Sequence, residues 1–94
     1  MEGICVLGIS GSVGQSTVKV LRSFPNFFSL KAFSVHSNIK LAKDLIQEFS
    51  PLLVCITDEG ARQILGDAFL STKIVYGEEG LDEIVSLSEV RTVV

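Results

Sequence analysis

The sequence predicts an α/β fold, in which a Rossmann-like parallel sheet carries helices on both faces. Three observations support this prediction. Short apolar runs alternate with segments of helical periodicity, the links between them are short, and a glycine-rich turn joins the first run to the first helical segment. This alternation is typical of parallel strands joined by right-handed crossovers. With 94 residues, the chain makes at most one domain.

The first predicted unit contains the glycine-rich turn. Residues 4–7 form an apolar run typical of a buried strand. A helix with one apolar stripe is expected to follow, formed by Thr17, Val20, Leu21 and Phe24. Between them stand Gly8, Gly11 and Gly14, in the spacing G-x-x-G-x-x-G rather than the dinucleotide fingerprint G-x-G-x-x-G. Glycines allow a sharp turn, close approach of a ligand, and tight packing of the helix on the strand.

Unpaired amides at the start of such a helix favour an anion, usually a phosphate. We therefore predict that the turn is a phosphate cradle. The alternative is a connection that only joins strand to helix.

The second unit is a strand at residues 30–35 followed by a helix. Pro25 ends the first helix, and Asn38 is a suitable N-cap for the second. The apolar stripe of this second helix consists of Ala42, Leu45, Ile46 and Phe49. Pro51 follows it and ends it. We expect a Rossmann-like domain in which Asn38 lies at the carboxyl edge of the sheet.

The third strand, residues 52–57, is apolar without interruption, which indicates burial on both faces. Thr57 or Asp58 is expected to cap a third helix with the stripe Ala61, Ile64, Leu65 and Ala68. A short strand at 73–76 and a short helix carrying Leu81, Ile84 and Val85 come next. Residues 91–94 begin a further strand. We expect the strand order 3-2-1-4, and a chain that is the amino-terminal piece of a longer protein.

Composition limits the possible partners. The formal net charge is −3, so there is no electrostatic footprint for nucleic acid or an anionic membrane. No apolar run approaches the roughly 20 residues needed to span a bilayer. Because the first predicted strand starts at once, we expect no targeting peptide. Cys5 and Cys55 lie inside predicted strands, which predicts buried free thiols in a reducing compartment, the cytoplasm.

The end of the second strand indicates which cofactor the cradle holds. NAD-binding folds place an acid there to bind the ribose hydroxyls, whereas this chain has His36, Ser37 and Asn38, and no acid before Asp44. Without that charge a 2′-phosphate is not repelled, so NADPH is favoured. Ser37 and Asn38 can donate hydrogen bonds to it, and Lys40 is close enough in sequence to add charge. The plainer roles are a helix cap for Asn38, a solvated lysine, and a surface or adenine-stacking histidine.

Two other phosphate-handling classes do not match. A phospho-acceptor signalling domain needs an acidic pair after the first strand, where this chain has residues 8–10, Gly-Ile-Ser. A Walker-type site needs a lysine after its last glycine, and none follows Gly14 directly. A stand-alone NAD(P)-binding or nucleotide-sensing module without catalysis stays open as an alternative.

Residues 7–17, LGISGSVGQST, resemble the L-G-S-T-G-S-I-G-x-S-T turn that opens 1-deoxy-D-xylulose 5-phosphate reductoisomerases. The likeness continues through FSP at 49–51, TDE at 57–59 and GEEGL at 77–81, and it covers the whole chain. Two departures stand out. Ile9 and Ser10 replace the commoner Ser and Thr, and His36 and Ser37 replace Gly and a basic residue. The second departure removes a cation from a phosphate contact, which puts tight selectivity for NADPH in question.

The resemblance implies the NADPH-binding part of an enzyme of non-mevalonate isoprenoid biosynthesis. Such an enzyme converts 1-deoxy-D-xylulose 5-phosphate to 2-C-methyl-D-erythritol 4-phosphate, needs a divalent metal (Mg or Mn), and is usually a homodimer. It implies that Ser10, Gly11, Ser12 and Val13 contact the pyrophosphate, and that His36, Ser37 and Asn38 lie near the adenosine phosphate. Metal ligands and substrate-phosphate residues are implied outside this chain, in a catalytic domain. The 94 residues alone are therefore expected to be inactive.

Overall fold

The computed structural model describes residues 1–66, 68–69 and 71–94. Its elements along the chain are β1 (Glu2–Val6), α1 (Ser12–Ser23), β2 (Phe28–Val35), α2 (Ile39–Phe49), β3 (Leu53–Ile56), η1 (Glu59–Ala61), α3 (Arg62–Leu65), β4 (Ala68–Phe69), β5 (Thr72–Tyr76), α4 (Gly80–Val85) and β6 (Thr92–Val93). They form one sheet in the order β4-β5-β3-β2-β1-β6. Pairing is parallel except between β4 and β5. The predicted Rossmann-like α/β class is therefore confirmed.

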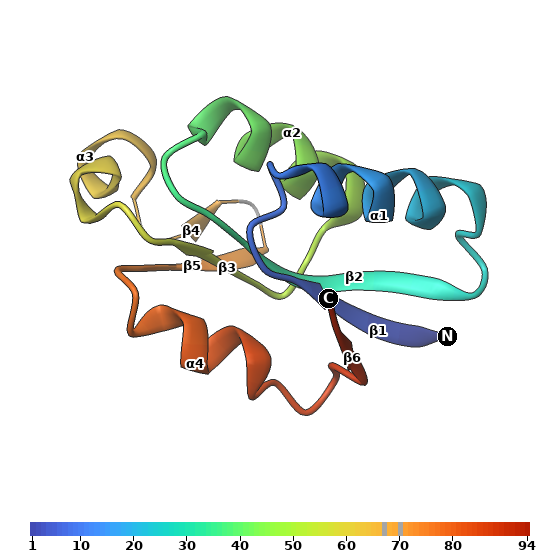
Figure 1. The fold of residues 1–94 in the computed structure, drawn as a ribbon. Coiled ribbons are helices and arrows are strands. Elements are labelled where there is room, and N and C mark those ends of the chain that lie inside the picture. The colour runs from blue at the N-terminus through green and yellow to red at the C-terminus, as the bar shows by residue number, and fades with distance from the viewer. Residues whose placement is uncertain (67, 70) are drawn as a thin grey trace.

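The helices cover both faces of the sheet, as predicted (Figure 1). Helices α1 and α2 lie on one face and α4 on the other. This follows from the crossovers: β1, β2 and β3 advance in one direction, whereas α4 carries the chain back from β5 to β6 beside β1. The expected order 3-2-1 is observed for the first three strands. The next parallel strand, β5, extends the sheet beside β3, and the last strand, β6, takes the place beside β1.

The buried face of α1 differs from the predicted stripe. Gly14, Val18 and Leu21 are buried, whereas Val20 and Phe24 are 47% and 49% exposed. The close contact of Gly14 with the turn before the helix fixes the rotation of α1 about its axis. Positions one turn apart from Gly14 then face the sheet, and Val20 turns outward.

Helix α2 matches its prediction closely. Asn38 is the N-cap, and its side-chain oxygen accepts a hydrogen bond from the Leu41 amide at 3.1 Å. The stripe residues Ala42, Leu45 and Ile46 are buried, and Phe49 packs against the same core. The helix ends before Ser50, whose φ of 48° is left-handed.

The third predicted helix is much shorter than its stripe suggested. Asp58, one of the two expected caps, accepts a hydrogen bond from the Gly60 amide at 3.0 Å. A single 3₁₀ turn and the four-residue α3 follow, and Gly66, at φ 83°, ends them. Ile64 is 68% exposed, and Ala68 belongs to β4 rather than to a helix. The chain thus leaves helical geometry before the stripe is complete, because the glycine adopts a conformation that no helix contains.

Strand β3 is buried along its whole length, as its apolar run predicted. Side chains on its two sides enter two separate cores. The larger core lies under α1 and α2 and includes Phe33 and Val54, and the smaller one lies under α4 and includes Ile84. Burial on both faces is what a central parallel strand requires.

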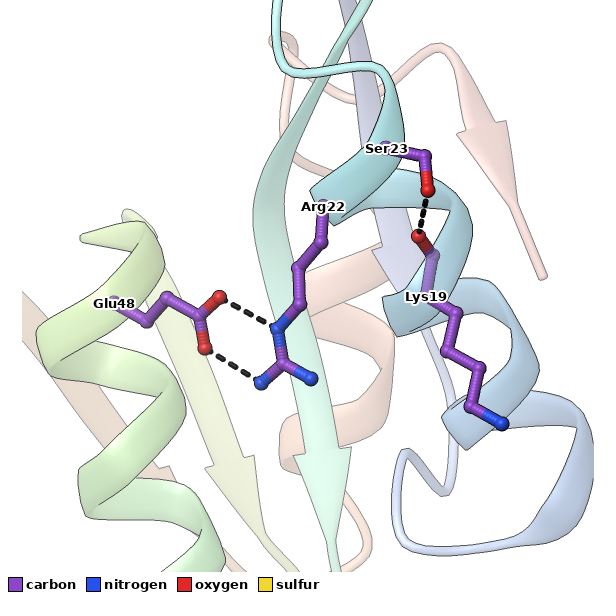
Figure 2. A network of polar contacts seen from close by, with 4 residues as sticks. All are labelled: Lys19, Arg22, Ser23 and Glu48. Atoms are coloured by element: carbon purple, nitrogen blue, oxygen red, sulfur yellow. Dashed lines mark hydrogen bonds and ion pairs between the residues drawn. The ribbon is translucent and has the colours of Figure 1, made fainter.

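Helices α1 and α2 are also joined by an ion pair at their ends (Figure 2). The Nε and Nη2 atoms of Arg22 lie 2.6 Å and 2.7 Å from the two carboxylate oxygens of Glu48. The hydrogen bonds from Arg22 hold the pKa of the Glu48 carboxyl below its usual range. One residue further along α1, the Ser23 hydroxyl donates to the Lys19 carbonyl at 3.0 Å. The pair is exposed, so it is expected to add little stability.

Cys5 and Cys55 are buried free thiols, as predicted. Burial raises the pKa of each thiol to about 11, and at Cys55 the carboxylates of Glu79 and Glu83 add to the effect. Both thiols are therefore protonated and poor nucleophiles at neutral pH.

The raised thiol pKa values predict a loss of stability in alkali. In the unfolded chain the thiols lose their protons near the ordinary pKa of 9.0, whereas in the fold they keep them until about 11. The free energy of unfolding is thus expected to fall as the pH rises through this window. Urea denaturation at a series of pH values measures this fall. In Cys55→Ala the free energy of unfolding is expected to fall less steeply with pH, because one of the two thiols is removed. A stability that stays constant across the window would contradict it.

Candidate functional site

The glycine-rich turn lies at the carboxyl end of β1. Gly8 has a φ of 62°, and an added Cβ there would meet nothing within 4 Å, so the backbone faces open space. Two bonds attach the turn to β2: the Gly8 amide donates to the Ser34 hydroxyl at 2.8 Å, and the Ile9 amide donates to the Ser34 carbonyl at 2.9 Å. The Gly11 amide closes the turn on the Gly8 carbonyl at 3.0 Å. Three hydrogen bonds therefore hold the turn, and its backbone at Gly8 is accessible to a ligand.

Gly14 sets the distance between α1 and the turn. A Cβ on Gly14 would lie 2.5 Å from the Ile9 carbonyl oxygen and 2.6 Å from the Ile9 Cα. This is the close packing for which the third glycine of dinucleotide-binding turns is used. Ile9, which replaces a commoner serine, is fully buried and packs in the larger core. Because Gly14 has no side chain and Ile9 is buried, the start of α1 packs closely against the end of β1.

The start of α1 presents free amides. Gly11 is the N-cap and supplies no side-chain cap, and the first amide bonded within the helix is that of Gln15, which donates to the Gly11 carbonyl at 2.9 Å. The amides of residues 12–14 therefore precede the helical hydrogen-bond ladder. Residues 12–15 read Ser-Val-Gly-Gln, without an acid. Free amides and the positive end of the helix dipole together make an anion site.

The four residues predicted for the pyrophosphate all lie at this accessible turn. Ser10, Gly11, Ser12 and Val13 are exposed, and Val13 is 67% exposed. A shallow groove runs along the outside of α1 from Ser12 and Val13 to Val20. All four residues are thus accessible to solvent.

The second predicted cluster lies at the end of the neighbouring strand. His36, Ser37 and Asn38 are exposed and join β2 to α2. Since β1 and β2 are adjacent and parallel, both clusters lie at the carboxyl edge of one sheet. Asn38 uses its side-chain oxygen for the cap, which leaves its NH₂ group as a donor. Lys40 forms an exposed ion pair with Asp44 at 3.3 Å.

Sequence reasoning missed three residues that shape this edge. Ser34 anchors Gly8 from inside β2, and its only sequence clue is a hydroxyl within the otherwise apolar residues 32–35. Gln15 donates from Nε2 to the Ile9 carbonyl at 2.9 Å and closes the turn from the helix side. Thr57 contacts the His36 ring from the end of β3. Two of these contacts join residues more than 20 positions apart, and the third joins residues six positions apart across a turn, so no helix or strand periodicity predicts them.

The described residues also meet a simple test for a dinucleotide phosphate. Open space lies over Gly8, and a Cβ on Gly11 would meet only the Gly8 carbonyl oxygen, at 3.4 Å. The donors are backbone amides, and the end of β2 carries no acid. The residues present therefore fit a phosphorylated dinucleotide.

Within residues 1–66, 68–69 and 71–94, no group of three or more His, Cys, Asp or Glu side chains is placed to hold a metal ion. Among the same residues, no helix has the length and apolar character to cross a membrane.

Comparison with known proteins gives a consistent picture. The family model described as 1-deoxy-D-xylulose 5-phosphate reductoisomerase matches residues 4–94. The chain is 57% identical over 94 residues to the protein of that name from Leptospira biflexa, and 49% identical over 84 residues to that from Geobacillus kaustophilus. The first match covers 100% of this chain and 24% of the Leptospira protein. The second covers 88% of this chain and 22% of the Geobacillus protein. The chain thus spans about a quarter of the length of these relatives.

Solved structures agree with the sequence relatives. The crystal structure of DOX-P reductoisomerase in complex with NADPH, fosmidomycin and magnesium is 34% identical, with a TM-score of 0.86 over 99% of this chain and 24% of that one. The Zymomonas mobilis reductoisomerase in complex with NADPH, 22% identical, shares the fold with a TM-score of 0.84 over 94% of this chain and 24% of that one. The motif residues, the fold and the family match agree: the chain belongs to the 1-deoxy-D-xylulose 5-phosphate reductoisomerase family.

Proposed function

We propose that residues 1–94 are the amino-terminal part of an NADPH-binding Rossmann-like domain in a 1-deoxy-D-xylulose 5-phosphate reductoisomerase. The observation that carries the proposal is the juxtaposition at one sheet edge of an open glycine turn, the free amides of α1, and the acid-free end of β2. A related reductoisomerase is solved with NADPH bound. NADPH would supply the hydride for reduction of the substrate.

The pyrophosphate is assigned to the turn before α1. Ser10, Ser12 and Val13 provide backbone amides on an exposed surface, and the two serines add hydroxyls. The Gly11 amide closes the turn on Gly8, and the Gly11 backbone lies between these donors. The glycine at position 11 keeps the backbone accessible, since no side chain stands between the amides and the ligand.

The adenosine 2′-phosphate is assigned to the loop after β2. Ser37 offers a hydroxyl, and the Asn38 side chain offers its NH₂ group while its oxygen caps α2. His36 begins the loop and lies beside the end of β3. Lys40 is one position into the helix, and its exposed ion pair with Asp44 is weak enough to exchange for a phosphate contact.

The rest of the reaction requires chain beyond these residues. The proposal places the divalent metal, Mg or Mn, and the sugar-phosphate substrate on a separate catalytic domain, in a protein that acts as a cytoplasmic homodimer. Under this proposal the 94-residue chain binds cofactor but does not turn over substrate.

An NMR titration of the chain with NADPH and, separately, NADH tests the cofactor assignment. Amides of residues 10–13 and 36–38 are expected to shift with NADPH, and NADPH is expected to bind more tightly than NADH. Amides at the opposite end of the sheet, such as Gly3, should stay unchanged. Equal affinities would remove the 2′-phosphate assignment, and a folded chain without shifts would contradict the proposal.

Asn38→Asp sharpens this test, because aspartate caps a helix as well as asparagine does but places a negative charge beside the expected phosphate. The affinity for NADPH is expected to fall about tenfold or more, whereas NADH binding changes little. Equal loss for both cofactors would show that the substitution acts through the fold instead.

A further inference from the structure

Backbone hydrogen bonds between β2 and β3 continue past the ends of both strands. The strands pair in parallel register up to Val35 and Ile56, and the ladder then continues beyond them. The Thr57 amide donates to the Val35 carbonyl at 3.0 Å, and the Asp58 amide donates to the His36 carbonyl at 2.9 Å. The backbones of His36 and Thr57 are therefore held side by side at the carboxyl edge.

The side chains of these two residues also meet. Nδ1 of His36 lies 2.9 Å from Oγ1 of Thr57, which is half-buried. The same hydroxyl lies 3.5 Å from the Val35 carbonyl, to which it can only donate. A hydroxyl has one hydrogen, so donation to Val35 leaves its lone pair to accept from Nδ1–H. The other ring nitrogen, Nε2, is then unprotonated and an acceptor.

Within the part of the chain that the structure describes, Nε2 has no hydrogen-bond partner. The ring itself is on the exposed edge, next to the loop assigned to the adenosine phosphate. An acceptor at this place is complementary to the 6-amino group of adenine, which is a donor.

We propose that Thr57 is a positioning residue for the adenosine end of the cofactor. Its hydroxyl fixes the orientation and tautomer of the His36 ring, so that Nε2 accepts from the adenine amino group. The cofactor site thereby extends from the end of β2 to the end of β3. This inference rests on the proposed function, since it takes the bound nucleotide to be NADPH.

The contact itself is tested without ligand. The sequence contains one histidine, so its ring ¹⁵N signals need no further assignment. The neutral ring is expected to carry its proton on Nδ1 in the parent chain and in Thr57→Ser. Thr57→Val, which keeps the shape but removes the hydroxyl, is expected to return the ring to the Nε2–H form that free histidine favours. An Nε2–H ring in the parent chain would overturn the proposal.

The role in binding is tested with NADPH and its deamino analogue, in which a 6-oxo group replaces the amino group. The parent chain and Thr57→Ser are expected to bind NADPH about threefold to tenfold more tightly than the analogue. His36→Ala and Thr57→Val should both lose this preference. The double variant, with both His36→Ala and Thr57→Val, should bind NADPH as tightly as His36→Ala alone does, because Thr57 acts only through the histidine ring.

The outcomes separate the inference from the function on which it rests. If the parent chain binds NADPH but Thr57→Val still prefers NADPH to the deamino analogue, the positioning role is wrong and the cofactor assignment stands. The same holds if the effects of His36→Ala and Thr57→Val on NADPH affinity add. If the folded parent chain binds neither nucleotide, the proposed function fails and the inference falls with it. A well-dispersed amide spectrum establishes in each case that the variant is folded.

Discussion

Gly14→Ala is expected to destabilise the protein by about 3 kcal/mol and to abolish cofactor binding. The added methyl group would lie 2.5 Å from the Ile9 carbonyl oxygen and 2.6 Å from the Ile9 Cα, and these backbone atoms cannot move aside as a flexible side chain could. The gain in helix propensity, up to about 1 kcal/mol, does not offset this overlap. Either α1 shifts away from the turn or the turn opens. Urea denaturation measures the loss of stability, and an unfolding free energy equal to that of the parent chain would contradict the prediction.

Gly11→Ala is the matched control in the same turn. Gly11 has extended backbone angles, and its new Cβ would meet only the Gly8 oxygen, at 3.4 Å. Stability is expected to change by no more than about 0.5 kcal/mol. Under the proposed pyrophosphate assignment, the methyl group would nevertheless stand between the backbone and the ligand. We therefore expect Gly11→Ala to stay folded but to bind NADPH more weakly, in contrast with Gly14→Ala.

Ser34→Ala is expected to cost about 1–3 kcal/mol and to loosen the cradle. The Ser34 side chain is buried, and its hydroxyl is the acceptor for the Gly8 amide at 2.8 Å. Alanine fills nearly the same space but leaves that amide without its acceptor. Hydrogen exchange at Gly8 should accelerate together with the loss of stability. The Ile9 amide should stay protected, since its acceptor is the Ser34 backbone carbonyl.

Ser29→Ala is the comparison for this prediction. Ser29 lies on the same strand, is half-buried, and its hydroxyl makes no hydrogen bond within the described residues. Its replacement is expected to change stability by no more than about 0.5 kcal/mol and to leave exchange at Gly8 unaltered. Equal effects of the two substitutions would indicate a general sensitivity of β2 rather than a specific anchor.

The sequence by itself predicted the fold class, the succession of β1, α1, β2, α2 and β3, and the sheet edge at which the candidate site is proposed. These features depend on local patterns: the apolar runs of β1, β2 and β3, the glycine spacing before α1, and the cap at Asn38. Each is set by interactions within a few residues, so the linear pattern contains the necessary information. The assignment of individual cofactor contacts from that pattern stays a prediction that the titrations above will test.

The tertiary structure alone decided the features that depend on how one element packs against another. The buried face of α1 is fixed by the contact of Gly14 with Ile9, and this contact turned Val20 outward against the sequence pattern. The third helix ended early at Gly66, where the chain turns back into β4 beside β5. Ser34 and Thr57 gained roles at the candidate site only because β1, β2 and β3 lie side by side. Contacts across a parallel sheet join residues more than 20 positions apart, and no local periodicity specifies such contacts.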